Sequence, residues 1–321
     1  MSIVITGTGG ALPANIVTND DLSSIVETSD EWIQSRTGIQ QRHFKSGDES
    51  TSSLATKAAQ QALESANLTV DDIDLIIVGT ATPDLTFPSV ACQVQANLGM
   101  KHGAAFDLAA ACSGFIYALS MAESQIQTGK AKRALVIGAE TFSDLITPED
   151  RTTYVLFGDG AGAVVIEKTN DESDTTSGIQ AIEIFSNGEY IKDLYSSGGV
   201  ASTGTAGSVI MNGREVFKHA TKTLSSLVTY MLDKYNVDKD DIDWLIPHQA
   251  NKRIIDATAK HLGMESSKVV LTVGEHANTS AASIPLALNV AVRDGRVKKG
   301  DLLFLEAFGA GFTWGAALIR F

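Results

Sequence analysis

The chain has 321 residues, 44% of them hydrophobic, and its formal net charge at pH 7 is −13. This length exceeds what one hydrophobic core usually fills, so we expect two domains or two similar halves. The acidic balance argues against a nucleic-acid-binding protein, and no apolar run reaches the roughly 18 residues that a membrane span needs.

Strand-like apolar runs alternate with helical segments along the chain. The first residues read MSIVITGTGGALP and begin directly with a strand-like run, without the basic region of a signal peptide. Further strands are predicted at 73–80, 133–140, 162–168, 242–248 and 301–308, and helices at 50–67, 112–129, 214–235, 251–262 and 279–294. This alternation predicts an α/β fold with parallel sheets covered by helices.

Three stretches of the first half recur, in the same order, in the second half. DDIDLII at 71–77 returns as DDIDWLI at 240–246, an offset of 240 − 71 = 169. The run that ends at Glu140 aligns with the run that ends at Glu306, an offset of 306 − 140 = 166. Further on, GAGAVVI resembles TWGAALI near the C-terminus. Three repeated segments in the same order indicate an internal duplication.

The duplication predicts two related halves, residues 1–170 and 171–321. The offset of 166 places Cys112 opposite Asn278, since 278 − 112 = 166, and the offset of 169 places the loop after the first repeat opposite the loop that holds His248. Both loops follow the carboxyl ends of predicted strands, where ligands of α/β sheets bind. We therefore expect Cys112, His248 and Asn278 to converge on one site.

Cys112 is a candidate nucleophile. Three alanines precede it and Ser-Gly follows, which leaves room for a substrate. A helix is expected to begin here, and the amide groups at a helix N-terminus favour the thiolate and lower the thiol pKa. The alternative is a small buried side chain, which is what most free cysteines are and what we expect of Cys92. Two cysteines without metal-ligand spacing suit a reducing cytoplasm.

Two histidines compete for the role of active-site histidine. His248, in LIPHQANKR, follows a strand and precedes a polar turn, a position that suits catalysis. His276 lies two residues before Asn278, and the duplication does not exclude it. Asn278 itself has an alternative role as the N-cap of the following helix. The glycine-rich turn FGAGFTWG at 308–315 would let the backbone approach a reacting carbonyl.

Eight motifs, in order and at matching spacing, carry a resemblance to a known family. They are TSDEWIQSRTGIQQRH (28–43), FPSVACQVQ (87–95), AACSGF around Cys112, FGDGAGA (157–163), MNGREVFK (211–218), PHQANKRI (247–254), HANTSAASIP (276–285) and EAFGAGFTWG (306–315). The chain resembles the β-ketoacyl-acyl-carrier-protein synthase III family, the initiating condensing enzymes of bacterial fatty-acid synthesis within the thiolase superfamily. The resemblance implies thiolase-like αβαβα layers with two duplicated halves, in a cytoplasmic homodimer.

The resemblance also implies an acyltransferase reaction and a catalytic set of Cys112, His248 and Asn278. In the family, the cysteine takes the acyl group of a short acyl-coenzyme A, usually acetyl; malonyl-acyl-carrier protein then loses carbon dioxide and condenses with it. The backbone N–H groups of Cys112 and Ala310 would hold the oxyanion. Ala310 stands where the family often has glycine, and we expect it to adopt an ordinary φ. No metal or cofactor is implied, because the coenzyme A thioester is a substrate.

The family's binding residues carry over onto positions of this chain. The coenzyme A site is expected at Trp32, Arg36, Arg151, Gly213, Phe217, Ala250 and Asn251, with the adenine stacked between Trp32 and Arg151. The acyl-carrier-protein surface is expected at Gln249, Ala250, Asn251, Lys252, Arg253, Arg214, Lys218, Lys222 and Lys260. Phe87 is expected to cross the dimer interface and close the acyl pocket of the other subunit.

Two basic helix faces fit an acidic partner. Arg214, Lys218 and Lys222 are spaced by four residues on one predicted helix, and Arg253 and Lys260 are seven apart on another. Each set therefore projects from one face. In a chain of this net charge, such faces suggest an anionic binding partner, either the strongly acidic acyl-carrier protein or the phosphates of coenzyme A. Arg214 departs from the residue that the family leads us to expect.

Other functions compete with this interpretation. Papain-like cysteine hydrolases also use a Cys–His–Asn set, but the duplicated halves and the lack of a protease signature around Cys112 weigh against them. The complete catalytic set opposes a non-catalytic thiolase-like scaffold. Thiolases proper use a second cysteine in the C-terminal half, and elongating synthases have a second histidine where Asn278 stands. The strongest rival is a related condensing enzyme of secondary metabolism with another acyl-coenzyme A primer, and the primer's length and branching stay open.

Overall fold

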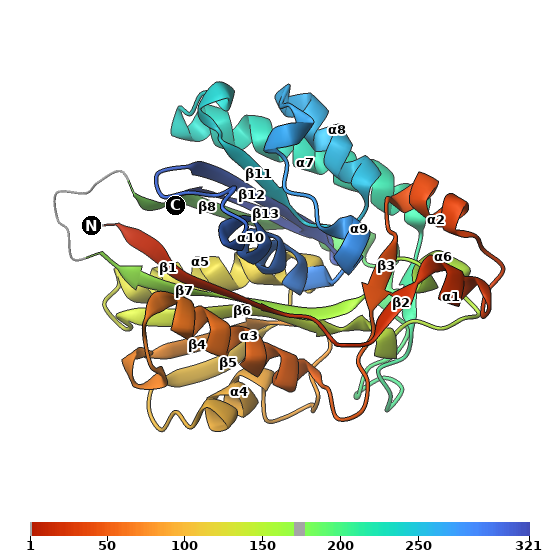
Figure 1. Cartoon of the computed structure of the whole chain (residues 1–321), viewed down its shortest axis with the longest axis horizontal. Coiled ribbons are helices and arrows are strands. Elements are labelled where there is room, and N and C mark those ends of the chain that lie inside the picture. The colour runs from red at the N-terminus through yellow and green to blue at the C-terminus, as the bar shows by residue number, and fades with distance from the viewer. Residues whose placement is uncertain (1, 170–176) are drawn as a thin grey trace.

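Five alternating layers, helix–sheet–helix–sheet–helix, make up the body of the protein (Figure 1). The computed structural model describes residues 2–169 and 177–321, so the expected junction of the halves at 170/171 lies outside the described residues. The αβαβα layering expected from the sequence is confirmed. None of the helices in these two ranges is long and apolar enough to cross a membrane.

The first half forms a five-stranded sheet in the order β1-β7-β6-β4-β5. Its strands are β1 (Ile3–Ala11), β4 (Leu75–Gly79), β5 (Ala104–Leu108), β6 (Arg133–Thr141) and β7 (Asp159–Lys168). The second half forms a four-stranded sheet in the order β11-β12-β13-β8. Its strands are β8 (Gly178–Ser186), β11 (Trp244–Pro247), β12 (Leu302–Gly309) and β13 (Thr313–Arg320).

Both sheets are mixed, so the expectation of parallel sheets was wrong in part. β4 runs parallel to β5 and β6, and β11 runs parallel to β12. In contrast, β7 runs antiparallel to β6 and β1, and β13 runs antiparallel to β12 and β8. A parallel connection needs a crossover of a dozen or more residues, whereas the few residues between β12 and β13 suffice only for a hairpin.

Helices fill the three remaining layers (Figure 1). The outer helices are α3 (Thr51–Ala66) and α4 (Val90–Leu98) on the first sheet, and α7 (Gly213–Tyr235) and α8 (Lys252–Leu262) on the second. Between the sheets lie α5 (Gly114–Gln127) and α10 (Ser283–Arg293). All of these except α4 coincide, within a few residues at each end, with helices that the sequence predicted.

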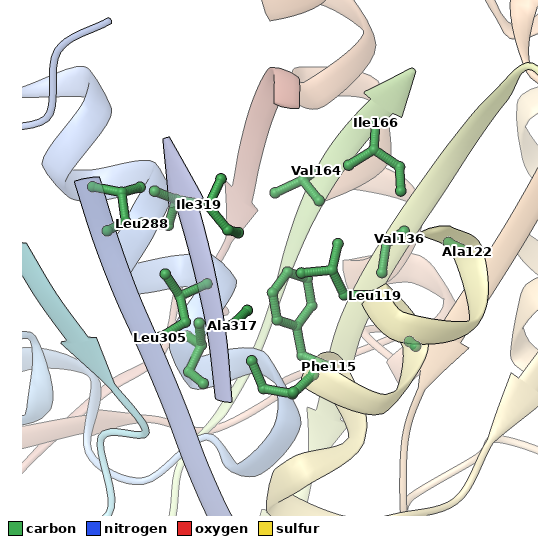
Figure 2. Packing of buried hydrophobic residues seen from close by; sticks show 14 of the residues in the cluster. Phe115, Leu119, Ala122, Val136, Val164, Ile166, Leu288, Leu305, Ala317 and Ile319 are labelled. Atoms are coloured by element: carbon green, nitrogen blue, oxygen red, sulfur yellow. The ribbon is translucent and has the colours of Figure 1, made fainter. Parts of the chain in front are cut away.

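The main core lies between the two sheets. Figure 2 shows Phe115 and Leu119 of α5 against Val136 and Val164 of the first sheet and Leu305 of the second. All five are at most 1% exposed, and burying a side chain of this size contributes about 1.5–3 kcal/mol to folding. This core fixes α5, and with it the residues just before α5, at the centre of the molecule.

Small elements gather at one end of the layers (Figure 1). They are β2 (Ile16–Thr18), α1 (Asn19–Ser23), α2 (Asp30–Thr37), β3 (Gln41–His43), α6 (Arg151–Tyr154), β9 (Leu194–Ser196), β10 (Val209–Met211) and α9 (Val273–His276). Helix α2 begins at the N-cap Ser29, whose side chain accepts the N–H of Trp32, and ends at Gly38 in a left-handed conformation with φ 78°. These caps fix the direction in which α2 presents Trp32 and Arg36.

The duplication is present, but its register differs from the sequence alignment by three residues. Pairing in the sheets sets Leu75 beside Ala134 and Trp244 beside Leu303, so both strand pairs are related by 169 (244 − 75 and 303 − 134). Helix α5 begins at 114 and α10 at 283, again an offset of 169. The structural counterpart of Glu140 is therefore residue 309 and not Glu306.

The lengths of the two central helices explain the mismatch. Helix α5 has 14 residues and α10 has 11, so the offset falls from 169 to 166 at the glycines that follow them, Gly129 and Gly295. The loop before β12 is correspondingly longer, and the offset returns to 169 in the strand. Cys112 is thus equivalent to Ala281 (112 + 169) and not to Asn278.

Candidate active site

One cavity of about 560 Å³ holds the three residues expected to act together. Cys112, His248 and Asn278 all line it. They come from the turn before α5, the loop after β11 and the loop between α9 and α10. The two turns that begin the central helices pack closely, since a Cβ on Gly114 would lie 3.2 Å from the Ala281 Cβ. Because of this contact, Cys112 and Asn278, which are more than 160 positions apart in the sequence, line the same cavity.

Cys112 lies in a 3₁₀ turn (Ala111–Ser113) directly before α5 and is 7% exposed. Ala111 has a positive φ of 47°, a conformation costing about 1–2 kcal/mol in a residue with a Cβ. Such strain is often found at functional sites.

The expectation that the Cys112 thiol has a low pKa was wrong. Burial raises its pKa to about 12; the Glu140 carboxylate raises it further, while a hydrogen bond with Ser280 lowers it. Burial dominates because the second half of the chain covers the thiol, which the residues flanking Cys112 in the sequence do not reveal. The thiol is therefore protonated at neutral pH and needs a proton acceptor before it can act as a nucleophile.

His248 is 6% exposed and is held by α10. Its Nδ1 lies 2.6 Å from the Ser283 hydroxyl, which also accepts the N–H of Gln249 at 3.2 Å. Burial lowers the pKa of His248 to about 3, so the ring is neutral. If Ser283 donates to Nδ1, the ring proton sits on Nε2, where it can serve as a hydrogen-bond donor.

Asn278 is oriented by its own backbone turn. Its Oδ1 accepts the N–H of Ser280 at 2.9 Å, which leaves the Nδ2 hydrogens to donate elsewhere. Its main chain is fixed to the first half, since its N–H donates to Leu156 and its carbonyl accepts from Gly158, both at 3.0 Å. The second donor of the cavity is thus positioned by both halves.

The competing histidine, His276, lies elsewhere. It is 7% exposed, its ring packs edge-to-face on His43 with centroids 6.5 Å apart, and it is not among the residues that line the cavity. Burial lowers the pKa of His276 to about 4. The structure therefore favours His248 over His276 as the histidine of the site.

The glycine-rich turn after β12 lies against the backbone of Cys112, the candidate nucleophile. A Cβ on Gly309 would lie 2.7 Å from the backbone nitrogen of Cys112, so glycine is required there for the close approach. The Thr313 hydroxyl lies 2.9 Å from the Ala110 carbonyl and 3.0 Å from the Ala310 carbonyl, which ties the two loops together. Ala310 is not among the residues with positive φ, so it adopts the ordinary backbone conformation that we expected.

Trp32 and Arg151 already stack on each other. The Arg151 guanidinium lies 4.8 Å from the Trp32 ring centroid and also donates to the Glu27 carbonyl at 2.6 Å. Trp32 and Arg36 line the mouth of the cavity, together with Gly213, Phe217, Ala250 and Asn251. A planar ligand that entered between Trp32 and Arg151 would have to part them.

The expected basic residues lie at different distances from the mouth of the cavity, and some of them are paired with carboxylates. Arg214 and Arg253 line the cavity, with the Arg253 guanidinium 5.0 Å from the Phe217 ring centroid. Lys218 is paired with Glu215 at 3.0 Å and Lys252 with Asp256 at 2.7 Å. Lys222 and Lys260 are exposed further along α7 and α8, and Lys222 lines a separate groove.

Gln249 corrects one expectation about the surface. It is 0% exposed, and its Nε2 donates to the carbonyls of Pro247 and Val270 at 2.8 and 3.0 Å. Its Oε1 accepts the N–H groups of Thr272 and Val273 at 2.8 and 3.1 Å. All its polar atoms are satisfied inside the fold, so its side chain braces the His248 loop instead of meeting a partner.

A smaller cavity of about 100 Å³ lies on the other side of the thiol. Its lining residues are Ala81, Ala111, Cys112, Phe142, Leu145, Phe157, Leu194, Tyr195, Ser196, Val209 and Ala310. Phe142 and Phe157 stack with ring centroids 4.7 Å apart. Phe87, expected at an acyl pocket, does not line this cavity from within the same chain and is 83% exposed.

Reasoning from the sequence missed three polar residues around the site: Ser280, Ser283 and Glu140. Both serines lie in the motif HANTSAASIP, where the signal available was only a run of hydroxyl residues before a helix. Glu140 was noticed as part of the repeat, but its proximity to the thiol depends on contacts between the halves.

Comparisons with known proteins show which family the chain resembles along its length. Residues 106–188 match the family model described as 3-oxoacyl-[acyl-carrier-protein] synthase III, and residues 232–321 match the model of its C-terminal part. The β-ketoacyl-[acyl-carrier-protein] synthase III of Sphingopyxis alaskensis is 56% identical over 317 residues, 99% of this chain and 98% of that protein.

Solved structures give the same result. The 3-oxoacyl-[acyl-carrier-protein] synthase III of Aquifex aeolicus superposes with a TM-score of 0.94 at 47% identity, covering 99% of this chain and 100% of that one. The priming β-ketosynthase of the R1128 polyketide biosynthetic pathway has a TM-score of 0.92 at 31% identity, covering 99% of this chain and 96% of that one. The described fold therefore has close counterparts among solved β-ketoacyl synthases.

Proposed function

Because the chain belongs to the β-ketoacyl-acyl-carrier-protein synthase III family, we propose that this enzyme condenses a short acyl-coenzyme A with malonyl-acyl-carrier protein. The product is a 3-oxoacyl-acyl-carrier protein, which initiates fatty-acid synthesis. The observation that carries the proposal is the single cavity lined by Cys112, His248 and Asn278.

The first stage transfers the acyl group to Cys112. The thiolate attacks the thioester carbonyl, and coenzyme A leaves, so that one difficult condensation is divided into two easier steps. The backbone N–H groups of Cys112 and Ala310 are proposed to hold the oxyanion. Two observations support this role: Gly309 brings its loop against the Cys112 backbone, and Ala310 borders the small cavity beside the thiol.

The second stage needs hydrogen-bond donors for an enolate. Decarboxylation of the malonyl group places negative charge on its thioester oxygen, and His248 Nε2 and Asn278 Nδ2 are proposed to donate to it. A neutral histidine and an amide donate across the working pH range, and each preorganised donor contributes about 3–4 kcal/mol to stabilising such charge. This chemistry requires no metal or cofactor, since the coenzyme A thioester is a substrate.

Coenzyme A is proposed to enter along the line of Trp32, Arg36, Arg151, Gly213, Phe217, Ala250 and Asn251. Its adenine would replace the direct stack of Arg151 on Trp32 with a three-layer stack, which suits the flat guanidinium and indole groups. Asn251 also has a structural role, because its side chain caps α8 by accepting from Arg253 and donates to the Arg36 carbonyl at 3.2 Å.

Acyl-carrier protein is proposed to dock over the amino-terminal ends of α7 and α8. Arg214 and Arg253 border the cavity mouth, and Lys218, Lys222, Lys252 and Lys260 extend positive charge along the two helices. A basic surface on a chain of net charge −13 suits an acidic partner and steers its approach. Ala250 and Asn251 belong to this surface through the loop they form, whereas Gln249 supports it from inside.

Acetyl is the proposed primer because the space beyond the thiol is small. The cavity of about 100 Å³ that Phe142 and Phe157 border fits a two- to four-carbon acyl group better than a long chain. Phe87 is proposed to close this pocket in the other subunit of a homodimer. Phe87 is 83% exposed and Leu85, two residues before it, is 50% exposed. Phe106, on the edge strand β5, is 36% exposed. These exposed apolar side chains support an apolar interface with a second subunit.

The same reaction with another primer, in a pathway of secondary metabolism, is the alternative to consider. The likeness to the priming β-ketosynthase of a polyketide pathway favours it as the second candidate. The two functions differ in the acyl-coenzyme A that loads Cys112. A cytoplasmic location is proposed for either, since both cysteines are free thiols.

The test is to incubate the protein with radiolabelled acetyl-coenzyme A, without a malonyl donor, beside Cys112→Ala. Label retained by the wild-type protein and absent from the variant is the expected result. Label only from longer or branched acyl groups would favour the alternative. No label from any acyl-coenzyme A would refute the condensing reaction.

A further inference from the structure

Thr313, the first residue of β13, lies beside the site, and the reaction described above gives its side chain no role. Its backbone pairs with Gly309 of β12 and with Ser186 of β8, so three strands fix its position. Its hydroxyl lies 2.9 Å from the carbonyl oxygen of Ala110 and 3.0 Å from that of Ala310. A hydroxyl has one proton, so the two carbonyls share it in a three-centre hydrogen bond.

Ser113 makes a second contact between the same two segments, from the turn that holds Cys112. It is 0% exposed, and its hydroxyl donates to the Thr313 carbonyl at 3.0 Å. The Ser113 N–H donates to the Ala110 carbonyl at 3.0 Å and closes the turn around Cys112. Thr313 therefore holds the chain on both sides of Cys112, through Ala110 two residues before it and through Ser113 directly after it.

The two N–H groups proposed to hold the oxyanion lie within this set of contacts. That of Cys112 lies between Ala110 and Ser113 in the sequence, and that of Ala310 belongs to a residue whose carbonyl meets the Thr313 hydroxyl. Ala310 lies in the turn between β12 and β13, where no strand pairing fixes it. An oxyanion hole requires both donors to lie about 2.7–3.1 Å from one oxygen, so the separation of the two loops decides whether both can act.

The Thr313 hydroxyl can set this separation because of the charges that it joins. The carbonyl oxygens of Ala110 and Ala310 carry partial negative charges, and both face the same hydroxyl. The proton between them offsets their repulsion and draws the two loops together. A side chain of the same shape without a hydroxyl would leave both carbonyls facing a methyl group, and the loops would move apart.

We propose that Thr313 and Ser113 are positioning residues that hold the N–H groups of Cys112 and Ala310 at the separation that the oxyanion requires. Neither side chain touches the reacting atoms. The inference rests on the proposed function, in which Cys112 is acylated through a tetrahedral intermediate. If these hydrogen bonds served only to fold the β12–β13 hairpin, removing them would lower the melting temperature and leave the rate of acyl transfer unchanged.

The test follows transfer of the acetyl group of p-nitrophenyl acetate to Cys112, measured as the burst of p-nitrophenolate above the background of Cys112→Ala. This small ester also forms an oxyanion and needs neither coenzyme A nor acyl-carrier protein. Thr313→Val keeps the shape of the side chain and removes the hydroxyl. Its burst rate should fall by about tenfold, since a misplacement of 1 Å costs about 100-fold. Thr313→Ser keeps the hydroxyl and should stay within about twofold of the wild type.

A second reagent separates the position of the donors from the reactivity of the thiol. Iodoacetamide alkylates a thiol by displacement, without an oxyanion. Its rate on Cys112, followed by mass spectrometry of the peptide that contains this residue, should be the same in the wild type and in Thr313→Val. Thr56→Val is the matched control, because the Thr56 hydroxyl donates to the Ser52 carbonyl at 2.7 Å within α3 and does not line the cavity. It should lower the melting temperature and keep the burst.

Ser113→Ala removes the other hydrogen bond and should slow the burst by about two- to tenfold, the contribution of one such bond. This variant decides the matter if Thr313→Val does not fold. Wild-type bursts in both variants, an equal loss of burst and alkylation, or a Thr313→Ser as slow as Thr313→Val would overturn the positioning role. A wild-type burst with the ester, without labelling by any acyl-coenzyme A, would refute the proposed function and not the positioning role.

Discussion

Replacing Gly309 by alanine tests whether the turn after β12 positions Cys112, the proposed nucleophile. The added Cβ would lie 2.7 Å from the Cys112 nitrogen and 3.1 Å from its Cβ. Ordinary van der Waals contact begins at 3.4 Å, so the Cys112 backbone would have to retreat by 3.4 − 2.7 = 0.7 Å. Two well-packed backbone segments meet here, and neither can yield as a flexible side chain would.

Two consequences of this displacement have definite magnitudes. Overpacking of this kind costs about 1–3 kcal/mol of folding free energy, which should appear as a lower melting temperature. A shift approaching 1 Å in a reacting group costs about 100-fold in rate, so acylation should slow by about one to two orders of magnitude. Binding of coenzyme A at the site proposed around Trp32 should change little, since the atoms nearest to the added Cβ all belong to Cys112.

Single-turnover acylation by labelled acetyl-coenzyme A, with a thermal melt of the same samples, measures both effects. The matched control is Gly188→Ala, because a Cβ at Gly188 would meet nothing within 4 Å. Wild-type acylation and stability in Gly309→Ala would refute the argument that this glycine is needed for close approach to Cys112.

Four further changes test other parts of the site. Ser283→Ala removes the hydroxyl 2.6 Å from His248 Nδ1, so decarboxylation of malonyl-acyl-carrier protein should slow by about two- to tenfold, the contribution of one hydrogen bond, whereas Ser283→Thr should keep the rate. Phe142→Ala enlarges the cavity of about 100 Å³, and kcat/KM measured from acetyl- to hexanoyl-coenzyme A should shift towards the longer chains. Arg253→Glu reverses a charge at the cavity mouth, so KM for malonyl-acyl-carrier protein should rise and the dependence of this KM on salt should weaken. The rate of acylation by acetyl-coenzyme A, measured on the same variant, serves as the comparison. Burial raises the pKa of Glu306 from its ordinary value of 4.5 to about 8. The contribution of Glu306 to stability is therefore complete below about pH 4.5 and is lost as the pH rises through 8. Glu306→Gln should flatten the fall in melting temperature over that pH range.

The sequence was sufficient for an α/β fold, for its five layers through the family resemblance, and for the meeting of Cys112, His248 and Asn278 at one cavity. Alternating apolar runs predict strands and helices whose order allows few architectures, and the positions of Cys112 and His248 after strands indicate the edge where ligands bind. The direction of β7 and β13 could not be read in this way, because an apolar run is the same in a parallel and an antiparallel strand.

What the sequence could not give depends on contacts between the halves. We expected a low pKa for Cys112 because only the start of its own helix can be seen in the sequence. The burial that raises this pKa comes from elements far along the chain. Gln249 reads as a surface residue beside Lys252, yet its carboxamide is enclosed by the segment around Val270. Ser280 reaches Glu140 only because the turn before α10 packs against the first half.

The corrected register explains why a duplicated fold has a single candidate nucleophile. The counterpart of Cys112 is Ala281, and the counterpart of Ala111, with φ 47°, is Ser280, with φ 50°, so both halves build the same strained turn before a central helix. A Cβ on Gly138 would lie 2.1 Å from the Ala281 carbonyl oxygen, which shows how tightly the second turn is packed into the first sheet. Ala281 is only 1% exposed, so this packing encloses it. The second turn instead brings Ser280, and Asn278 just before it, against the first half. One symmetric backbone arrangement thus places the candidate nucleophile Cys112 from one half beside polar residues from the other.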